Sequence, residues 1–212
     1  KTIIYFLIAL MITGFFFTGY SYETNAKKTI VIQSVEGKLT DDMLNRSIQV
    51  ISGRLKDLSP EKFEILAIPE KNQIQIVLTD NWDMKAVENL ILQKGRLGIY
   101  ETSDNERLKE PLMTNSDVAV MKCLEDKSSG FYYLDIKFRD SSVAKWSDAT
   151  RRNINREIVI AVDDVVLANP LVREEIHNGS CQITGNFTLS EAAYLAALGN
   201  NGELPASFRI VQ

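Results

Sequence analysis

The sequence has little of the chemistry that most catalytic sites need. Its 212 residues include one histidine and two cysteines, which are too few for a Cys/His zinc site. It has no Walker loop, dinucleotide fingerprint or G-x-S-x-G elbow. Acidic residues outnumber basic ones by 28 to 24, so no overall basic field would attract nucleic acid. We therefore expect a non-enzymatic protein that uses no cofactor and no metal and binds no nucleic acid.

The longest uncharged run lies near the start of the sequence. Residues 3–22 carry no charge and follow Lys1. A helix of about 20 residues is about 30 Å long and can cross a bilayer. The small residues near Gly19 and Ser21 also fit a signal peptide. We expect residues 1–26 to be an uncleaved transmembrane anchor. The alternative is a cleaved signal segment, and in both cases the rest of the chain is exported.

The two cysteines allow two interpretations. Cys123 and Cys181 both lie in strand-like runs. In an exported protein they could form a disulfide. They could equally be two small, buried, apolar side chains. The sequence leaves both possibilities open.

The apolar pattern after the first segment predicts four strands and two helices in the order β-α-β-β-α-β. The strands are predicted at 29–35, 62–68, 73–79 and 96–101. The helices are expected to follow the N-caps Thr40 and Asp83, and to end at Ser59 and Gly95. This order predicts a ferredoxin-like unit, with two helices on one face of an antiparallel sheet, over residues 27–102.

A polar stretch at 103–117 is interpreted as a linker to a second α+β unit at 118–212. Strands are predicted at 118–124, 131–138 and 180–187, with a hairpin at 158–168 turning at Asp163–Asp164. Helices are expected after Ser141 or Ser142, from Pro170 to Gly179, and after the capping box Thr188–Glu191. The expected fold is therefore two connected ferredoxin-like units of the α+β class after an N-terminal apolar helix.

Two small groups of residues could carry chemistry. Glu174-x-x-His177 has the helical spacing of half a di-iron site, but the chain has no second histidine. We expect His177 to lie in the last turn of a short helix, where a partial positive charge suits the helix dipole. Asp163 and Asp164 could form an acid/base pair, but between two apolar strands a turn is the better interpretation.

A run of motifs then resembles a known family. The motifs are WSDATRRNI at 146–154, Ala168-x-Pro170, GSCQITGNFT at 179–188 and EAAYLA…GELP at 191–205. In this order, residues 145–205 resemble the first periplasmic domain of SecD, a subunit of the SecDF complex that assists the Sec protein-translocation channel. Residues 43–101, with Arg54 in a helix, resemble the preceding part of that domain less specifically.

The resemblance implies a membrane-proximal base and a mobile head that holds emerging polypeptide outside the bacterial inner membrane. The chain departs from the family at Asn155 and Asp164, where glycine is common. Both positions would be turns, and Asn and Asp tolerate such backbone angles better than most residues.

These observations favour a SecD-like periplasmic accessory protein, either anchored in the inner membrane or soluble after signal cleavage. We expect it to bind exported polypeptide or to dock on Sec or other envelope-complex subunits. The alternative is a structural subunit that keeps the fold without handling substrate. Extended polypeptide could add to an exposed strand, for which 131–138 is a candidate. With no basic field, such binding should depend little on salt.

Overall fold

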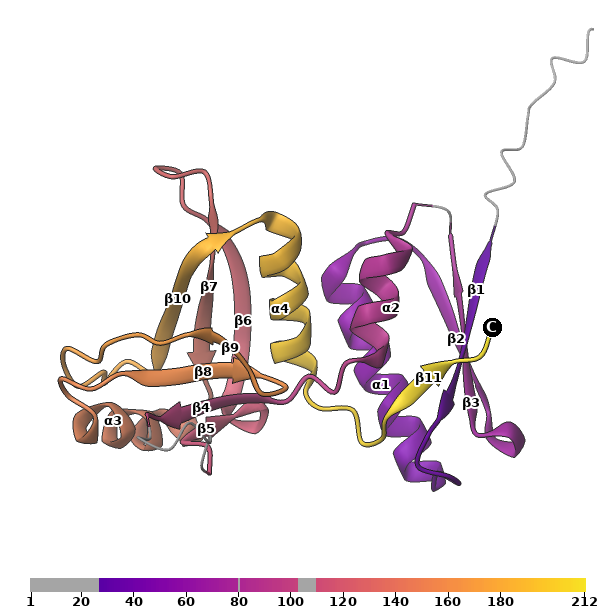
Figure 1. The fold of residues 1–212 in the computed structure, drawn as a ribbon, viewed down its shortest axis with the longest axis horizontal. Helices are drawn as coiled ribbons and strands as arrows, with labels where there is room; N and C mark the ends of the chain where they lie inside the picture. Colours follow the sequence, from indigo (N-terminus) through magenta and orange to yellow (C-terminus); the bar gives the residue numbers. More distant parts are fainter. Residues whose placement is uncertain (1–26, 80, 103–109) are drawn as a thin grey trace, which may run out of the picture.

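The computed structural model describes residues 27–79, 81–102 and 110–212. Its helices and antiparallel sheets confirm the expected α+β class. Two units lie side by side along the long axis of the molecule (Figure 1). We call them the base, at 27–95 and 207–212, and the head, at 96–206. The apolar run at 3–22 lies outside the described residues, and none of the helices described is long and apolar enough to span a membrane.

The base is a four-stranded antiparallel sheet with two helices on one face (Figure 1). Its elements are β1 (Lys28–Ser34), α1 (Asp41–Leu58), β2 (Phe63–Ile68), the short 3-10 helix η1 (Pro69–Lys71), β3 (Gln73–Leu78), α2 (Met84–Leu92) and β11 (Phe208–Ile210). The strand order is β11-β1-β3-β2. The N-caps predicted at Thr40 and Asp83 both form, since each side chain accepts a hydrogen bond from a backbone N–H of the first turn.

The last strand expected for the base forms, but it joins the head instead. β4 (Leu97–Glu101) pairs with β8 (Ile158–Val162) and β5 (Met113–Thr114) of the head. Its expected place in the base sheet is taken by β11, which pairs with β1. Apolar alternation reveals a strand but not its partner. The base is therefore completed by a strand from the other end of the sequence.

The head contains two antiparallel sheets and two helices. Its elements are β4, β5 (Met113–Thr114), η2 (Asn115–Asp117), β6 (Val118–Glu125), β7 (Tyr132–Phe138), η3 (Asp140–Ser142), α3 (Val143–Arg152), β8 (Ile158–Val162), β9 (Val165–Ala168), β10 (Ser180–Phe187) and α4 (Leu189–Asn201). The sheet orders are β10-β7-β6 and β5-β4-β8-β9. The polar stretch at 103–117 is therefore part of the head, because β5 and η2 form within it. Its residues 103–109 lie outside the described residues.

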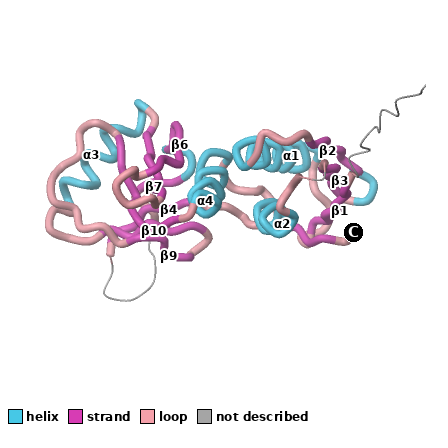
Figure 2. Tube along the Cα trace, turned by 90° about the horizontal axis from the view of Figure 1, so that it is seen from above, coloured by secondary structure: helices cyan, strands magenta, loops and turns pink. Residues whose placement is uncertain are grey.

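Apolar side chains from both sheets and both helices fill one core in the head. Trp146 of α3 is 1% exposed and packs against Phe138 of β7, with ring centroids 4.9 Å apart. The predicted capping box forms at the start of α4, between Thr188 and Glu191. α4 lies between the head sheets and α1 of the base (Figure 2). It is therefore the head helix that packs against the base.

The helix expected from Pro170 to Gly179 does not form. The Ile158 N–H donates to the Pro170 carbonyl at 3.1 Å, and the Asn155 N–H donates to the Val172 carbonyl at 2.8 Å. The segment therefore runs extended beside the residues that precede β8. Proline at a helix start and glycine at its end are local signals, and here tertiary backbone pairing overrides them.

The unusual turn positions form as the sequence predicts. Asn155 has a φ of 63°, and Asp163 and Asp164 have φ values of 49° and 66°. The Asp163 carboxylate also accepts hydrogen bonds from the N–H groups of Gly95 and Arg96, at 2.9 and 2.8 Å. The β8–β9 hairpin is thereby tied to the segment that enters the head.

Candidate polypeptide-binding groove

The two groups that the sequence offered as candidates for chemistry do not assemble into a site among the described residues. The side chain of His177 is 76% exposed and lies in a non-helical segment, so the expected helix-end position is wrong. Its Nδ1 lies 3.2 Å from Ser147 Oγ and 3.4 Å from Glu175 Oε1. Within the described residues, no three His, Cys, Asp or Glu side chains gather in a way that could hold a metal ion.

Both cysteines are free thiols. Cys123 on β6 and Cys181 on β10 flank the central strand β7 from opposite sides. Two strand spacings amount to about 9.5 Å, whereas a disulfide requires Cα atoms less than about 7 Å apart. Burial raises the pKa of Cys181 to about 12. The two residues therefore act as small apolar side chains.

Arg54 of α1 is fully buried at the joint between base and head. Its guanidinium donates to the carbonyls of Leu90, Gln93, Lys94 and Gly202, at 2.6 to 2.9 Å. Burial lowers the pKa of this group to about 10. Two of these carbonyls, those of Lys94 and Gly202, belong to the two chain crossings between the units. Arg54 is therefore a structural clamp rather than a reactive group.

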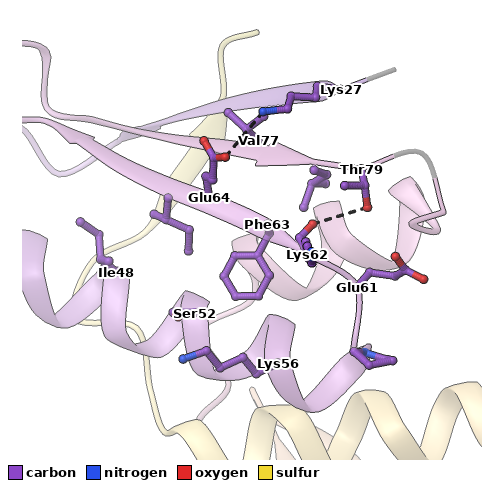
Figure 3. A pocket seen from close by; sticks show the side chains of 13 residues that line it. Lys27, Ile48, Ser52, Lys56, Glu61, Lys62, Phe63, Glu64, Val77 and Thr79 are labelled. Carbon is purple, nitrogen blue, oxygen red and sulfur yellow. Dashed lines mark hydrogen bonds and ion pairs between the residues drawn. The ribbon is translucent and has the colours of Figure 1, made fainter. Parts of the chain in front are cut away.

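A groove of about 650 Å³ lies on the base between α1 and β2 (Figure 3). Ile48, Ser52 and Lys56 line one wall, and their spacing of four residues places them on one helix face. Phe63 and Ile65 of β2 line the other wall. These apolar side chains are only partly buried. The groove thus offers a half-exposed apolar surface beside β2.

Charged side chains surround this apolar surface. Lys27 pairs with Glu64 at 3.6 Å, but their side chains are 63% and 66% exposed, so the pair contributes little stability and can open. Figure 3 shows Lys56 across the groove from this pair. The aromatic wall is more rigid, because Phe63 packs edge-on against Trp82 with centroids 6.1 Å apart.

β2 is one of the two edge strands of the base sheet. It pairs with β3 on one side, and the described residues place no strand on its other side. An edge strand presents alternate N–H and C=O groups that can pair with another chain. The strand proposed from the sequence, 131–138, cannot do this, because β7 lies between β6 and β10. Its aromatic, alternating sequence signals a strand but not whether the strand is central.

Sequence patterns alone did not reveal this groove. Ile48 belongs to the apolar stripe of a predicted helix, but Ser52 and Lys56 have no signal of their own. Phe63 and Ile65 lie in a predicted strand whose edge position depends on the strand order of the sheet. The usable signal was the two charges in KFEIL, because charged residues are common on edge strands.

The chain is similar to one protein family over most of its length. The family model described as the SecDF P1 head subdomain matches residues 96–206. Protein translocase subunit SecD of Acidaminococcus fermentans is 33% identical over 180 residues, covering 85% of this chain and 42% of that protein. SecD of Dictyoglomus turgidum is 26% identical over 206 residues, covering 97% of this chain and 50% of that protein. The chain thus spans half or less of the length of these relatives.

Solved structures agree in fold. One is SecDF in a super-membrane-facing form, with a TM-score of 0.75 and 21% identity over 87% of this chain and 29% of that one. Another, described as a membrane component SecDF that enhances protein export, gives a TM-score of 0.72 at 21% identity and covers 87% of this chain and 98% of that one. Both likenesses include the base as well as the head.

Proposed function

Because the chain belongs to the SecDF family through its P1 head subdomain, we propose that it is a non-enzymatic periplasmic part of a protein-translocation subunit in the bacterial envelope. In this proposal it holds exported polypeptide in extended form along β2. The observation that carries the proposal is the free edge of β2 beside a half-exposed apolar groove.

The chemistry of the groove fits a client without a fixed sequence. Backbone hydrogen bonds to an edge strand provide affinity that does not depend on side-chain identity. Phe63, Ile65 and Ile48 offer apolar contact to alternate side chains of an added strand. The backbone hydrogen bonds and the apolar contacts each contribute only a modest binding free energy, so we expect weak and reversible binding. A protein that must release its client requires such binding.

A groove-filling substitution tests this proposal. Ser52→Trp would place an indole in the groove, whereas Gln49→Trp adds the same group to an exposed position of α1 outside it. The full chain in detergent is titrated with a reduced, unfolded model protein. We expect Ser52→Trp to weaken binding about tenfold or more, a free-energy change of about 1.4 kcal/mol, and Gln49→Trp to leave it unchanged.

Two outcomes would contradict the proposal. Equal binding by both variants would place the client elsewhere. No binding by the unchanged protein at concentrations of about 1 mM, corresponding to a free energy weaker than about 4 kcal/mol, would favour the structural-subunit alternative.

A further inference from the structure

A second concave site lies where the base meets the head. This junction cleft has a volume of about 440 Å³. Arg46 of α1, Arg96 of the crossing into the head, and Arg139 between β7 and η3 all line it. The carboxylate among its lining residues is that of Glu203. Three positive charges against one negative charge therefore gather here, although the whole chain carries a net charge of −4.

The neutral walls of the cleft are fixed by their own hydrogen bonds. Asn115 accepts from the Leu97 N–H at 2.8 Å and donates to the Gly95 carbonyl at 3.1 Å. Asn200 accepts from the Met121 N–H at 2.6 Å and donates to its carbonyl at 3.0 Å. These amides are already engaged, so the walls hold their shape without a ligand.

The arginines, in contrast, retain donors for a ligand. Within the part of the chain that the structure describes, no carboxylate lies within ion-pair distance of Arg46 or Arg139. Arg139 donates from its Nε to the Ser116 carbonyl at 3.0 Å, and its terminal nitrogens have no hydrogen-bond partner among the residues that the structure describes. Arg96 pairs with Asp164 at 3.0 Å, but the two side chains are 51% and 66% exposed. Such a surface pair exchanges partners at little cost.

We infer that the junction cleft binds the carboxylates of an acidic polypeptide segment. The planar guanidinium presents paired donors that match a carboxylate. The cleft is concave and small, so side chains that project from a polypeptide can enter it. A flat bilayer surface fits less well, because its headgroups would have to extend into a recess. This site lies apart from the groove beside β2, and it adds a salt-dependent contact that net charge alone does not predict.

The probe is a fluorescent, Glu-rich peptide titrated into the full chain, with a Gln-rich peptide of equal length as the neutral control. We expect binding of the Glu-rich peptide alone, weakened by salt. Arg46→Gln and Arg139→Gln should each weaken it about tenfold, as loss of a hydrogen bond to a charged group does. Arg151→Gln removes the same charge from an exposed position of α3 outside the cleft and should leave binding unchanged.

A gain of affinity gives a readout that misfolding cannot imitate. Asp164→Asn releases Arg96 from its ion pair, and asparagine tolerates the positive φ of this position. We expect it to tighten peptide binding about threefold, within the range of a surface ion pair. Ser52→Trp should have no effect, so failure of this inference can be told apart from failure of the proposed groove.

Three results would overturn the inference. They are equal binding of the Gln-rich peptide, equal loss in Arg151→Gln and the cleft variants, and displacement of the peptide by glycerol phosphate at lower concentrations than by free glutamate. The last result would assign the cleft to a lipid headgroup instead.

Discussion

A buried guanidinium stabilises the joint of this molecule through four carbonyl partners, and among the described residues no carboxylate pairs with it. Arg54 keeps its charge in the interior because Leu90, Gln93, Lys94 and Gly202 surround it with acceptors. Gly95 leaves room for it, since a Cβ at that position would collide with the guanidinium. The apolar pattern of α1 predicted the helix, but a basic residue in a helix is ordinarily expected on its exposed face. Its buried role follows only from the two crossings that meet there.

Replacing Arg54 should therefore destabilise the fold strongly. Arg54→Met keeps much of the volume but leaves one buried and three partly buried carbonyls without this donor, and an unsatisfied buried acceptor costs about 1–3 kcal/mol. We expect the free energy of unfolding to fall by at least about 3 kcal/mol, measured by urea denaturation. Arg46→Met, on an exposed position of the same helix, is the matched control and should change it by less than about 0.5 kcal/mol. A small effect at Arg54 would contradict the clamp.

Asp117 gives the fold a pH-dependent contact. It is 6% exposed and accepts from Ser142 Oγ at 2.8 Å, Lys145 Nζ at 2.8 Å and the Thr114 N–H at 2.9 Å. Burial alone would raise its pKa, but these hydrogen bonds outweigh burial and hold the pKa below its ordinary value. The ionised form is therefore favoured by folding, and its contribution is complete above the unfolded pKa of about 3.9.

Asp117→Asn should consequently lower the free energy of unfolding at neutral pH by about 2 kcal/mol, since it removes a charged acceptor. The difference from the unchanged protein should shrink as the pH falls below about 4 and through the lowered pKa of Asp117. Urea denaturation across this pH range measures it, with the exposed Asp140→Asn as control. A difference that stays constant down to low pH would refute the ionic role.

At the scale of elements, the sequence predicts features that depend on neighbouring residues. It misses features that depend on residues far apart in the chain. The caps at Thr40, Asp83 and Thr188 form as expected, because capping depends on residues within one turn. The helix expected from Pro170 fails because the segment pairs with residues that precede β8. The groove was likewise out of reach, since it depends on which strand of the base sheet lies at the edge.

At the scale of the molecule, base and head are joined by two chain crossings rather than by a single linker. β4 leaves the base to join a head sheet, and β11 returns from the head to complete the base sheet. The crossings run side by side, and the Leu204 N–H donates to the Lys94 carbonyl at 2.9 Å. A break between β4 and β5 therefore leaves each fragment with a strand in both units.

This connectivity predicts the result of cutting the chain. A specific protease site is engineered within residues 104–108, and the protein is cleaved under native conditions. We expect the two fragments to elute together on size-exclusion chromatography and to separate only in denaturant. Separation under native conditions would instead support a simple linker between independent domains.

The position of β11 also sets an order of events during synthesis. Because synthesis proceeds from the N-terminus, β1, β2, β3 and both helices of the base are made long before residues 208–210. Until then β1, whose final neighbours are β3 and β11, keeps an open edge. The whole head is synthesised in that interval. The base is thus the first unit to begin folding and the last to finish, and its open edge during that interval could pair with the wrong strand.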